Sequence, residues 1–215
     1  AGMGADIYES MVAAIVAAMA IALTANATEL SRLVVDTNAT GNAKLAGVIL
    51  PLVLSAIGLV VSLLSIFIAR ALKNMNPAQV LRSALIMPPV ILVGLSFVLM
   101  NVFGLSQNIT IALAAGAFGG AIIGLVTDYY TSSTPVQRIA EASITGAGTN
   151  LIRGLAVGME SVGISMATIA LVAYIADRAL GLYGIALSAV GMLGGTAVVM
   201  TVDAYGPISD NAGGI

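Results

Sequence analysis

Apolar runs alternate with short polar segments along the whole chain, and six of the runs are long enough to cross a bilayer as helices. A spanning helix needs about 20 predominantly apolar residues. The runs that meet this length lie at residues 5–25, 46–72, 84–103, 109–130, 151–176 and 181–203. The pattern predicts an all-α, polytopic bundle of about six transmembrane helices, forming one domain over residues 1–215. Six crossings place both ends of the chain on the same side of the membrane.

Composition supports this prediction and narrows the chemistry that the chain can perform. Of 215 residues, 59% are hydrophobic and only 8% are charged, whereas a soluble domain carries roughly a quarter charged residues. The net charge of −2 excludes a basic surface for nucleic acid. The sequence contains neither histidine nor cysteine. Its chemistry must therefore rest on carboxylates, amides, hydroxyls, Arg and Lys, which suits hard cations such as Mg²⁺, Na⁺ and K⁺.

Basic residues indicate the orientation of the predicted helices by a narrow margin. On the side of the termini the loops hold Arg70, Lys73, Arg82 and Arg138, and on the other side they hold Arg32, Lys44 and Arg178. The positive-inside rule then favours termini in the cytosol, with Tyr129 and Tyr130 in an interfacial aromatic belt on that side. We expect an integral, multi-pass protein of the inner or plasma membrane, with a solvated connector over residues 26–44 on the far side.

The first apolar run begins with an acidic group formed by Asp6, Glu9 and Ser10. At helical spacing the three side chains share one arc and can converge on one neighbour. Residues 11–25 make only about 22 Å of helix, short of the ~30 Å hydrocarbon core, so the span must reach back to about Asp6. Carboxylates at that depth need a cation, a basic partner or a proton. The alternative is that this end simply emerges into water.

The last thirteen residues carry a second polar group, in which Asp203 and Asp210 are seven residues apart and share a helix face if the helix persists. Gly206 and Pro207 predict a kink or break between them. Oxygen ligands followed by Gly213 and Gly214 form a pattern expected where Mg²⁺ and phosphate bind, because glycine permits close backbone approach. Many glycine-rich turns are only loops, so a structural reading stays open here.

Two further features concern the helices themselves. In the fifth run, Arg153 and Glu160 are seven residues apart on one face, and they form either a structural pair or part of an ion path. Small residues recur in the fourth and sixth runs, and in lipid such residues let helices pack closely. These small residues are Gly116, Gly119, Gly120 and Gly124 in the fourth run, and Gly191, Gly194 and Gly195 in the sixth.

Several stretches together resemble the membrane-bound, ion-pumping pyrophosphatases, in the order in which that family carries them. They are residues 1–10 (AGMGADIYES), 127–131 (TDYYT), 139–143 (IAEAS), 146–152 (GAGTNLI), 154–161 (GLAVGMES) and 203–214 (DAYGPISDNAGG). These motifs bracket the entire chain. Because the chain opens without an initiator methionine and ends in Gly-Gly-Ile, we expect an internal piece of a longer protein, inactive by itself.

The resemblance implies hydrolysis of Mg²⁺-bound pyrophosphate on the cytosolic side, coupled to outward pumping of Na⁺ or H⁺, by a homodimer in the bilayer. It implies that Asp210 binds Mg²⁺ and that Asp203 and Asn211 support catalysis. Asp6, Glu9 and Ser10 would form the ion gate. K⁺ is a second candidate cofactor, whose requirement depends on residues outside this chain.

The gate glutamate stands at Glu9, with Ala13 one turn later, an arrangement similar to the Na⁺-pumping members and shared by some H⁺ pumps. Two other readings stay open from the residues alone. One is a secondary transporter with interrupted helices and buried carboxylates. The other is a non-catalytic membrane subunit whose acids hold helices together.

Overall fold

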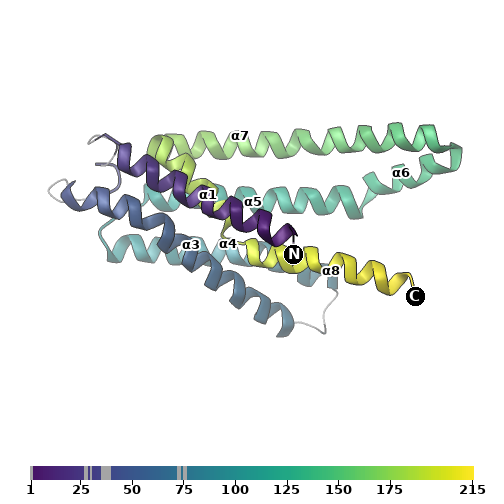
Figure 1. Ribbon diagram of the computed structural model, residues 1–215, viewed down its shortest axis with the longest axis horizontal. Coiled ribbons are helices and arrows are strands. Elements are labelled where there is room, and N and C mark those ends of the chain that lie inside the picture. Colours follow the sequence, from purple (N-terminus) through teal and green to yellow (C-terminus); the bar gives the residue numbers. More distant parts are fainter. Residues whose placement is uncertain (1, 27–28, 30, 35–39, 72–73, 75–76) are drawn as a thin grey trace.

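The computed structural model describes residues 2–26, 29, 31–34, 40–71, 74 and 77–215, and almost all of these residues are helical. Figure 1 shows long helices lying alongside one another, with both chain termini toward the same end of the bundle, here called the termini end. The helices are α1 (Gly2–Thr24), α3 (Thr40–Ala71), α4 (Pro77–Val102), α5 (Asn108–Ser132), α6 (Thr134–Thr145), α7 (Ala147–Leu193) and α8 (Thr196–Gly213). The predicted all-α class is confirmed.

Five segments of the described chain are long and apolar enough to cross a membrane. The last of them covers α7 and α8 together, residues 147–213. Within α7 the backbone is not helical at Leu180 and Gly181, and Gly181 has a φ of +63°. That left-handed conformation is accessible mainly to glycine. The chain reverses there, so residues 181–193 and α8 return toward the termini end (Figure 1).

The returning segment differs from the single run predicted for residues 181–203, because it is interrupted at Gly194 and Gly195. A Cβ built on Gly58 of α3 would lie only 2.9 Å from the Cα of Gly194, so the two backbones are in direct contact. The interruption leaves N–H groups of the first turn of α8 inside the bundle. The Val198 N–H donates to two acceptors, the Gly195 carbonyl at 3.1 Å and the hydroxyl of the buried Ser62 of α3 at 3.0 Å, so Ser62 serves as a second, interhelical cap.

We expect Ser62→Ala to lower the unfolding free energy by about 0.5–1 kcal/mol, because the Val198 N–H would lose one of its two acceptors and keep the Gly195 carbonyl. Thermal unfolding of the purified, complete protein in detergent measures this change. Ser65→Ala is the matched control. Ser65 is equally buried, but its hydroxyl donates to the Val61 carbonyl of its own helix at 2.9 Å. Equal loss of stability in both variants would contradict the capping role.

The core lies where α5 packs against residues 181–193, with α1, α3 and α4 completing it. A Cβ built on Gly116 would overlap the Ser188 carbonyl, and one on Gly191 would overlap the Leu113 carbonyl. Tyr183 adds a polar link, since its hydroxyl donates to the Gly47 carbonyl at 2.7 Å. The outward faces of α3, α4 and α7 expose many Leu, Ile, Val and Phe side chains, as expected for surfaces that face lipid or other apolar helices.

The connector over residues 26–44 is less solvated than predicted. Leu33 is buried in the core, and its carbonyl accepts a hydrogen bond from the Ser106 N–H at 2.9 Å. Val34 forms an isolated antiparallel bridge with Leu105 of the α4–α5 turn. Pairing between the two loops satisfies backbone groups that would otherwise need water. Residues 27–28, 30 and 35–39 of this connector lie outside the described part.

Candidate functional site

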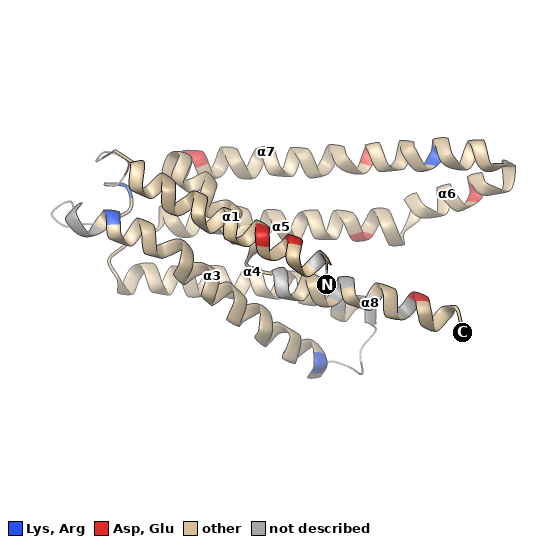
Figure 2. Cartoon of the chain, in the orientation of Figure 1, with Lys and Arg blue, Asp and Glu red and all other residues tan. Residues whose placement is uncertain are grey.

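The structure brings the two predicted acidic segments to the same end of the bundle. The start of α1 lies beside α8, since a Cβ built on Gly4 would be in ordinary contact with Met200 at 3.4 Å. Figure 2 shows the acidic positions of α1 and α8 in the halves of these helices nearest the chain termini. Residues about 200 positions apart in sequence are therefore neighbours at the termini end.

On α1, Asp6, Glu9 and Ser10 lie within little more than one turn of helix, and all three are exposed in this chain. The Ser10 hydroxyl donates to the Asp6 carbonyl at 2.9 Å, the usual local bond of a helical serine. The carboxylates of Asp6 and Glu9 have no ion-pair or hydrogen-bond partner within the described residues. They are free to bind a cation or to contact groups that this chain does not supply.

On α8, the helix continues from Thr196 to Gly213 through Gly206 and Pro207, so the predicted kink or break is not a break. A proline removes one backbone hydrogen bond, and where the helix is exposed water can satisfy the freed carbonyl. Gly206 and Pro207 are exposed in this way. Asp210 and Asn211 are exposed on the last turns, while the side chain of Asp203 lies outside the described residues.

The donor set at the end of α8 suits Mg²⁺, because carboxylate and amide oxygens are the ligands that this ion prefers. It is incomplete, however. No group of three or more acidic side chains close enough to hold a metal occurs in the described part of the chain. Asp210 and Asn211 can thus contribute ligands to a metal site but cannot enclose an ion by themselves. Their assignment as site residues stays a prediction.

Glu160 has a partner that the sequence did not indicate. The Tyr130 hydroxyl, at the end of α5, donates to Glu160 Oε1 of α7 at 3.2 Å. No ion pair joins Arg153 to Glu160 among the residues that the structure describes. In the sequence, only the predicted aromatic belt at Tyr129 and Tyr130 drew attention to the tyrosine of this pair. A role for Glu160 or Arg153 in an ion path stays a prediction.

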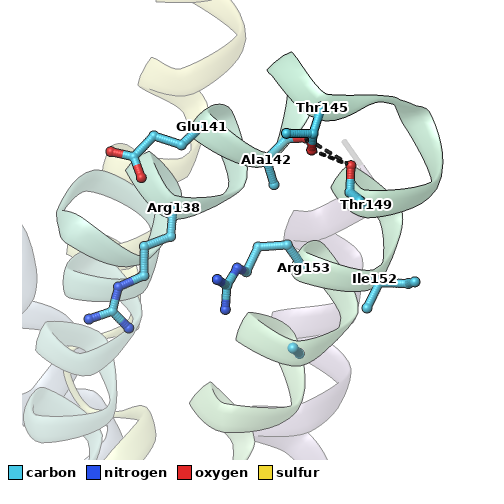
Figure 3. A pocket seen from close by; sticks show the side chains of 8 residues that line it. Arg138, Glu141, Ala142, Thr145, Thr149, Ile152 and Arg153 are labelled. Atoms are coloured by element: carbon cyan, nitrogen blue, oxygen red, sulfur yellow. Dashed lines mark hydrogen bonds between the residues drawn. The ribbon is translucent and has the colours of Figure 1, made fainter.

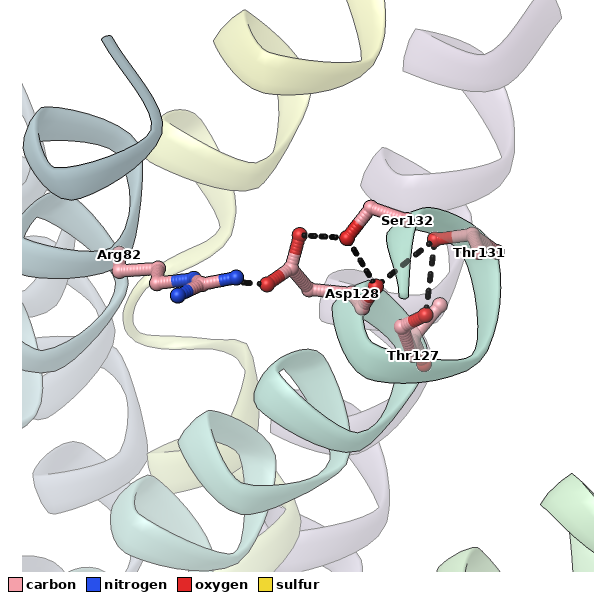
Figure 4. Close-up of polar contacts among 5 residues, drawn as sticks. All are labelled: Arg82, Thr127, Asp128, Thr131 and Ser132. Carbon is pink, nitrogen blue, oxygen red and sulfur yellow. Dashed lines mark hydrogen bonds and ion pairs between the residues drawn. The ribbon is translucent and has the colours of Figure 1, made fainter. Parts of the chain in front are cut away.

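A second polar link at the termini end joins α4 to α5 (Figure 4). Arg82 Nε lies 2.8 Å from Asp128 Oδ2, and the Ser132 hydroxyl donates to Asp128 Oδ1 at 3.1 Å. The pair is partly exposed, so its contribution to stability is about 0–1 kcal/mol. It fixes the relative position of two helices rather than forming a reactive site.

Comparison with known proteins shows that the chain belongs to the inorganic H⁺ pyrophosphatase family. The sequence profile of the family described as inorganic H⁺ pyrophosphatase matches residues 1–215. A putative K(+)-stimulated pyrophosphate-energized sodium pump of Clostridium tetani is 37% identical, over 100% of this chain and 31% of that protein. A K(+)-insensitive pyrophosphate-energized proton pump of Moorella thermoacetica is 35% identical, over 100% of this chain and 32% of that protein.

A K(+)-stimulated pyrophosphate-energized sodium pump of Thermotoga maritima is 46% identical over 46% of this chain. The chain spans about a third of the length of the relatives that it matches from end to end. Relatives named for sodium and for protons match it with similar identity. Together with the five apolar helices, these matches indicate an integral, multi-pass membrane protein.

Proposed function

Because the chain belongs to the family of membrane-bound inorganic H⁺ pyrophosphatases, we propose that the protein containing it hydrolyses Mg²⁺-bound pyrophosphate and uses the energy to move Na⁺ or H⁺ across the membrane. One observation supports assigning parts of this activity to residues of this chain. The unpaired acids of α1 lie at the same end of the bundle as Asp210 of α8. A substrate site and an ion gate can adjoin one another only if these segments are neighbours.

At the end of α8, Asp210 would hold Mg²⁺, and Asn211 and Asp203 would support the bound pyrophosphate. When bound, Mg²⁺ neutralises phosphate oxygens and stabilises the charge that develops as the bridging bond breaks. Asp210 has no competing partner in the described part of the chain, so its carboxylate needs no rearrangement before it binds a cation. The exposed Asn211 amide can donate to phosphate and accept from a metal-bound water.

On α1, Asp6, Glu9 and Ser10 would form the gate through which the ion passes. A carboxylate near the edge of the bilayer can bind Na⁺ directly or take up a proton, and either event removes the cost of its buried charge. Hydrolysis at the neighbouring site changes the charge there, which alters the affinity of the gate for its cation. Glu9, with Ala13 one turn later, favours Na⁺ as the pumped ion.

We further propose Mg²⁺ as the required cofactor, K⁺ as a second one, a homodimer as the assembled state and the cytosol as the side of the termini. The excess of basic residues in the loops at the termini end supports this orientation. The match to the pyrophosphatase family over the whole chain removes the reason to prefer a secondary transporter or a non-catalytic subunit.

Glu9→Ala in the complete protein is expected to reduce the number of ions moved per pyrophosphate hydrolysed by at least about tenfold, because the cation loses its charged ligand. Reconstituted vesicles that report phosphate release together with Na⁺ uptake and internal pH measure this ratio. Stimulation of hydrolysis by Na⁺ would identify the pumped ion. Glu29→Ala, which removes the same charge at the opposite end of the bundle, is the matched control. An unchanged transport ratio in Glu9→Ala would remove Glu9 from the gate.

A further inference from the structure

An open pocket of about 470 Å³ lies between α6 and the first turns of α7 (Figure 3). It belongs neither to the acidic segments nor to the links described above. Polar and apolar side chains share its lining. The residues are Arg138, Glu141, Ala142 and Thr145 of α6, and Thr149, Ile152, Arg153 and Ala156 of α7.

The two arginines of this pocket are brought together by a tight helical hairpin. Gly146, with a φ of +135°, reverses the chain between α6 and α7. The hydroxyls of Thr145 and Thr149 lie 2.6 Å apart across the turn, and Thr149 also donates to the Ala142 carbonyl at 3.0 Å. Arg138 is eight residues before Gly146 and Arg153 is seven after it. In antiparallel helices these nearly equal separations place both arginines at the same height.

The positive charge of the two arginines is not compensated within the described chain. Both side chains are exposed, and neither has an ion-pair or hydrogen-bond partner there. Glu141 also lines the pocket, but Figure 3 shows its carboxylate pointing away from both guanidinium groups. Glu160, two turns after Arg153, is engaged by Tyr130. Two guanidinium groups that face one pocket suit a phosphate group, which accepts their paired N–H donors.

The length of α7 is compatible with a pocket at the membrane surface. From Arg153 to Ala176 the helix rises about 34 Å, and the exposed, charged Asp177 and Arg178 follow at the opposite end. The hydrocarbon core is about 30 Å thick. With Asp177 at one interface, Arg153 therefore lies just outside the hydrocarbon at the other, in the layer that contains lipid headgroups.

An apolar groove runs from this level along α7 toward the middle of the membrane. It has a volume of about 550 Å³, and its lining includes Leu151, Leu155, Met159 and Val162, all with exposed side chains. Gly154 and Gly158 form its floor, and neither has a neighbouring atom within 4 Å of a built Cβ. Ile139, adjacent to Arg138, closes the α6 side. The groove is wide open and mostly apolar, so it offers an acyl chain a surface to lie along rather than an enclosed channel.

We propose that Arg138 and Arg153 bind the phosphate of an anionic phospholipid, whose acyl chain follows the groove on α7. The charge of the pocket, its depth and the adjoining apolar groove together favour a lipid over a soluble anion. Basic pockets between helices on one side of a membrane are suited to such headgroups. This site is separate from the proposed pyrophosphate site and does not depend on it.

Nanodiscs that contain the complete protein, with phosphatidylglycerol diluted in phosphatidylcholine, test the proposal, and native mass spectrometry counts the bound anionic lipids. Arg138→Gln with Arg153→Gln is expected to weaken phosphatidylglycerol binding by about tenfold or more. The matched control is Lys44→Gln with Arg178→Gln, which removes the same charge at the opposite end and should leave binding unchanged. Arg153→Lys keeps the charge but loses the paired donors, so an intermediate loss is expected.

Two outcomes would overturn the lipid site. One is equal retention of phosphatidylglycerol by the Arg138/Arg153 double variant and by its control. The other is displacement of the lipid from the unaltered protein by millimolar inorganic phosphate, which would mean that the pocket recognises a free anion. Size-exclusion chromatography of each variant checks its folding, which should be preserved because both arginines are exposed.

Discussion

Asp210→Asn in the complete protein is expected to lower Mg²⁺-dependent pyrophosphate hydrolysis by at least about a hundredfold. The substitution preserves the size of the side chain but removes its negative charge. A neutral amide binds Mg²⁺ less well than a carboxylate, and it leaves the phosphate charge less compensated in the transition state. Because Asp210 is exposed and makes no side-chain hydrogen bond in the described chain, the substitution should leave the fold intact.

Phosphate release from purified protein, measured over a range of Mg²⁺ concentrations, separates two effects. A lost ligand alone shifts the Mg²⁺ requirement upward, whereas a lost transition-state contact lowers the maximal rate at saturating Mg²⁺. Asp177→Asn is the matched control, since Asp177 is also exposed but lies at the opposite end of the bundle, just before the break in α7. Hydrolysis at the unaltered rate in Asp210→Asn would remove this residue from the site and would leave the proposed role of α8 without support.

Gly116→Ala is expected to destabilise the bundle by about 3 kcal/mol, the upper part of the range for overpacking. The added methyl group would overlap the backbone carbonyl of Ser188 on the returning segment of α7. A backbone atom cannot move aside as a flexible side chain can, so the two helices must separate. In lipid, close packing of small residues replaces the hydrophobic drive for helix association, and separation forfeits that packing.

Thermal unfolding in detergent, with the yield of monodisperse protein, measures this loss. Gly163→Ala is the matched control because a Cβ at position 163 meets no atom within 4 Å. It should leave stability unchanged or raise it by up to about 1 kcal/mol through the better helix propensity of alanine. Gly191→Ala should resemble Gly116→Ala, since its Cβ would overlap the Leu113 carbonyl across the same interface. Equal melting temperatures for Gly116→Ala and Gly163→Ala would contradict the packing argument.

The helices were predictable because each requires only a local property of the sequence. The expected runs at residues 5–25 and 109–130 differ by no more than three residues at either end from α1 and α5. The break inside the sixth run was not predicted. Gly194 and Gly195 are equally compatible with packing residues of a continuous helix. The contact of Gly194 with Gly58 and the hydrogen bond to Ser62, which accompany the interruption, join residues far apart in the sequence.

The proposed site was predictable in part. Sequence alone selected Asp6, Glu9 and Asp210 as unusual acids, because carboxylates beside long apolar runs are costly without a partner. It did not reveal that α1 and α8 are neighbours, and it predicted a kink or break at Pro207 without deciding that α8 continues past it. Tyr130 and Glu160 are thirty residues apart, and no local pattern indicates such a bond.

By itself, the sequence determined that this chain is a helical membrane protein and that it resembles the membrane-bound pyrophosphatases. These conclusions follow from the length of apolar runs relative to bilayer thickness and from contiguous motifs. Both are local properties of the sequence. The tertiary structure decided which faces meet, where the returning segment breaks and which charges remain unpaired. Lipid is as apolar as a protein core, so a membrane helix carries little amphipathic pattern to distinguish its packed face from its outward one.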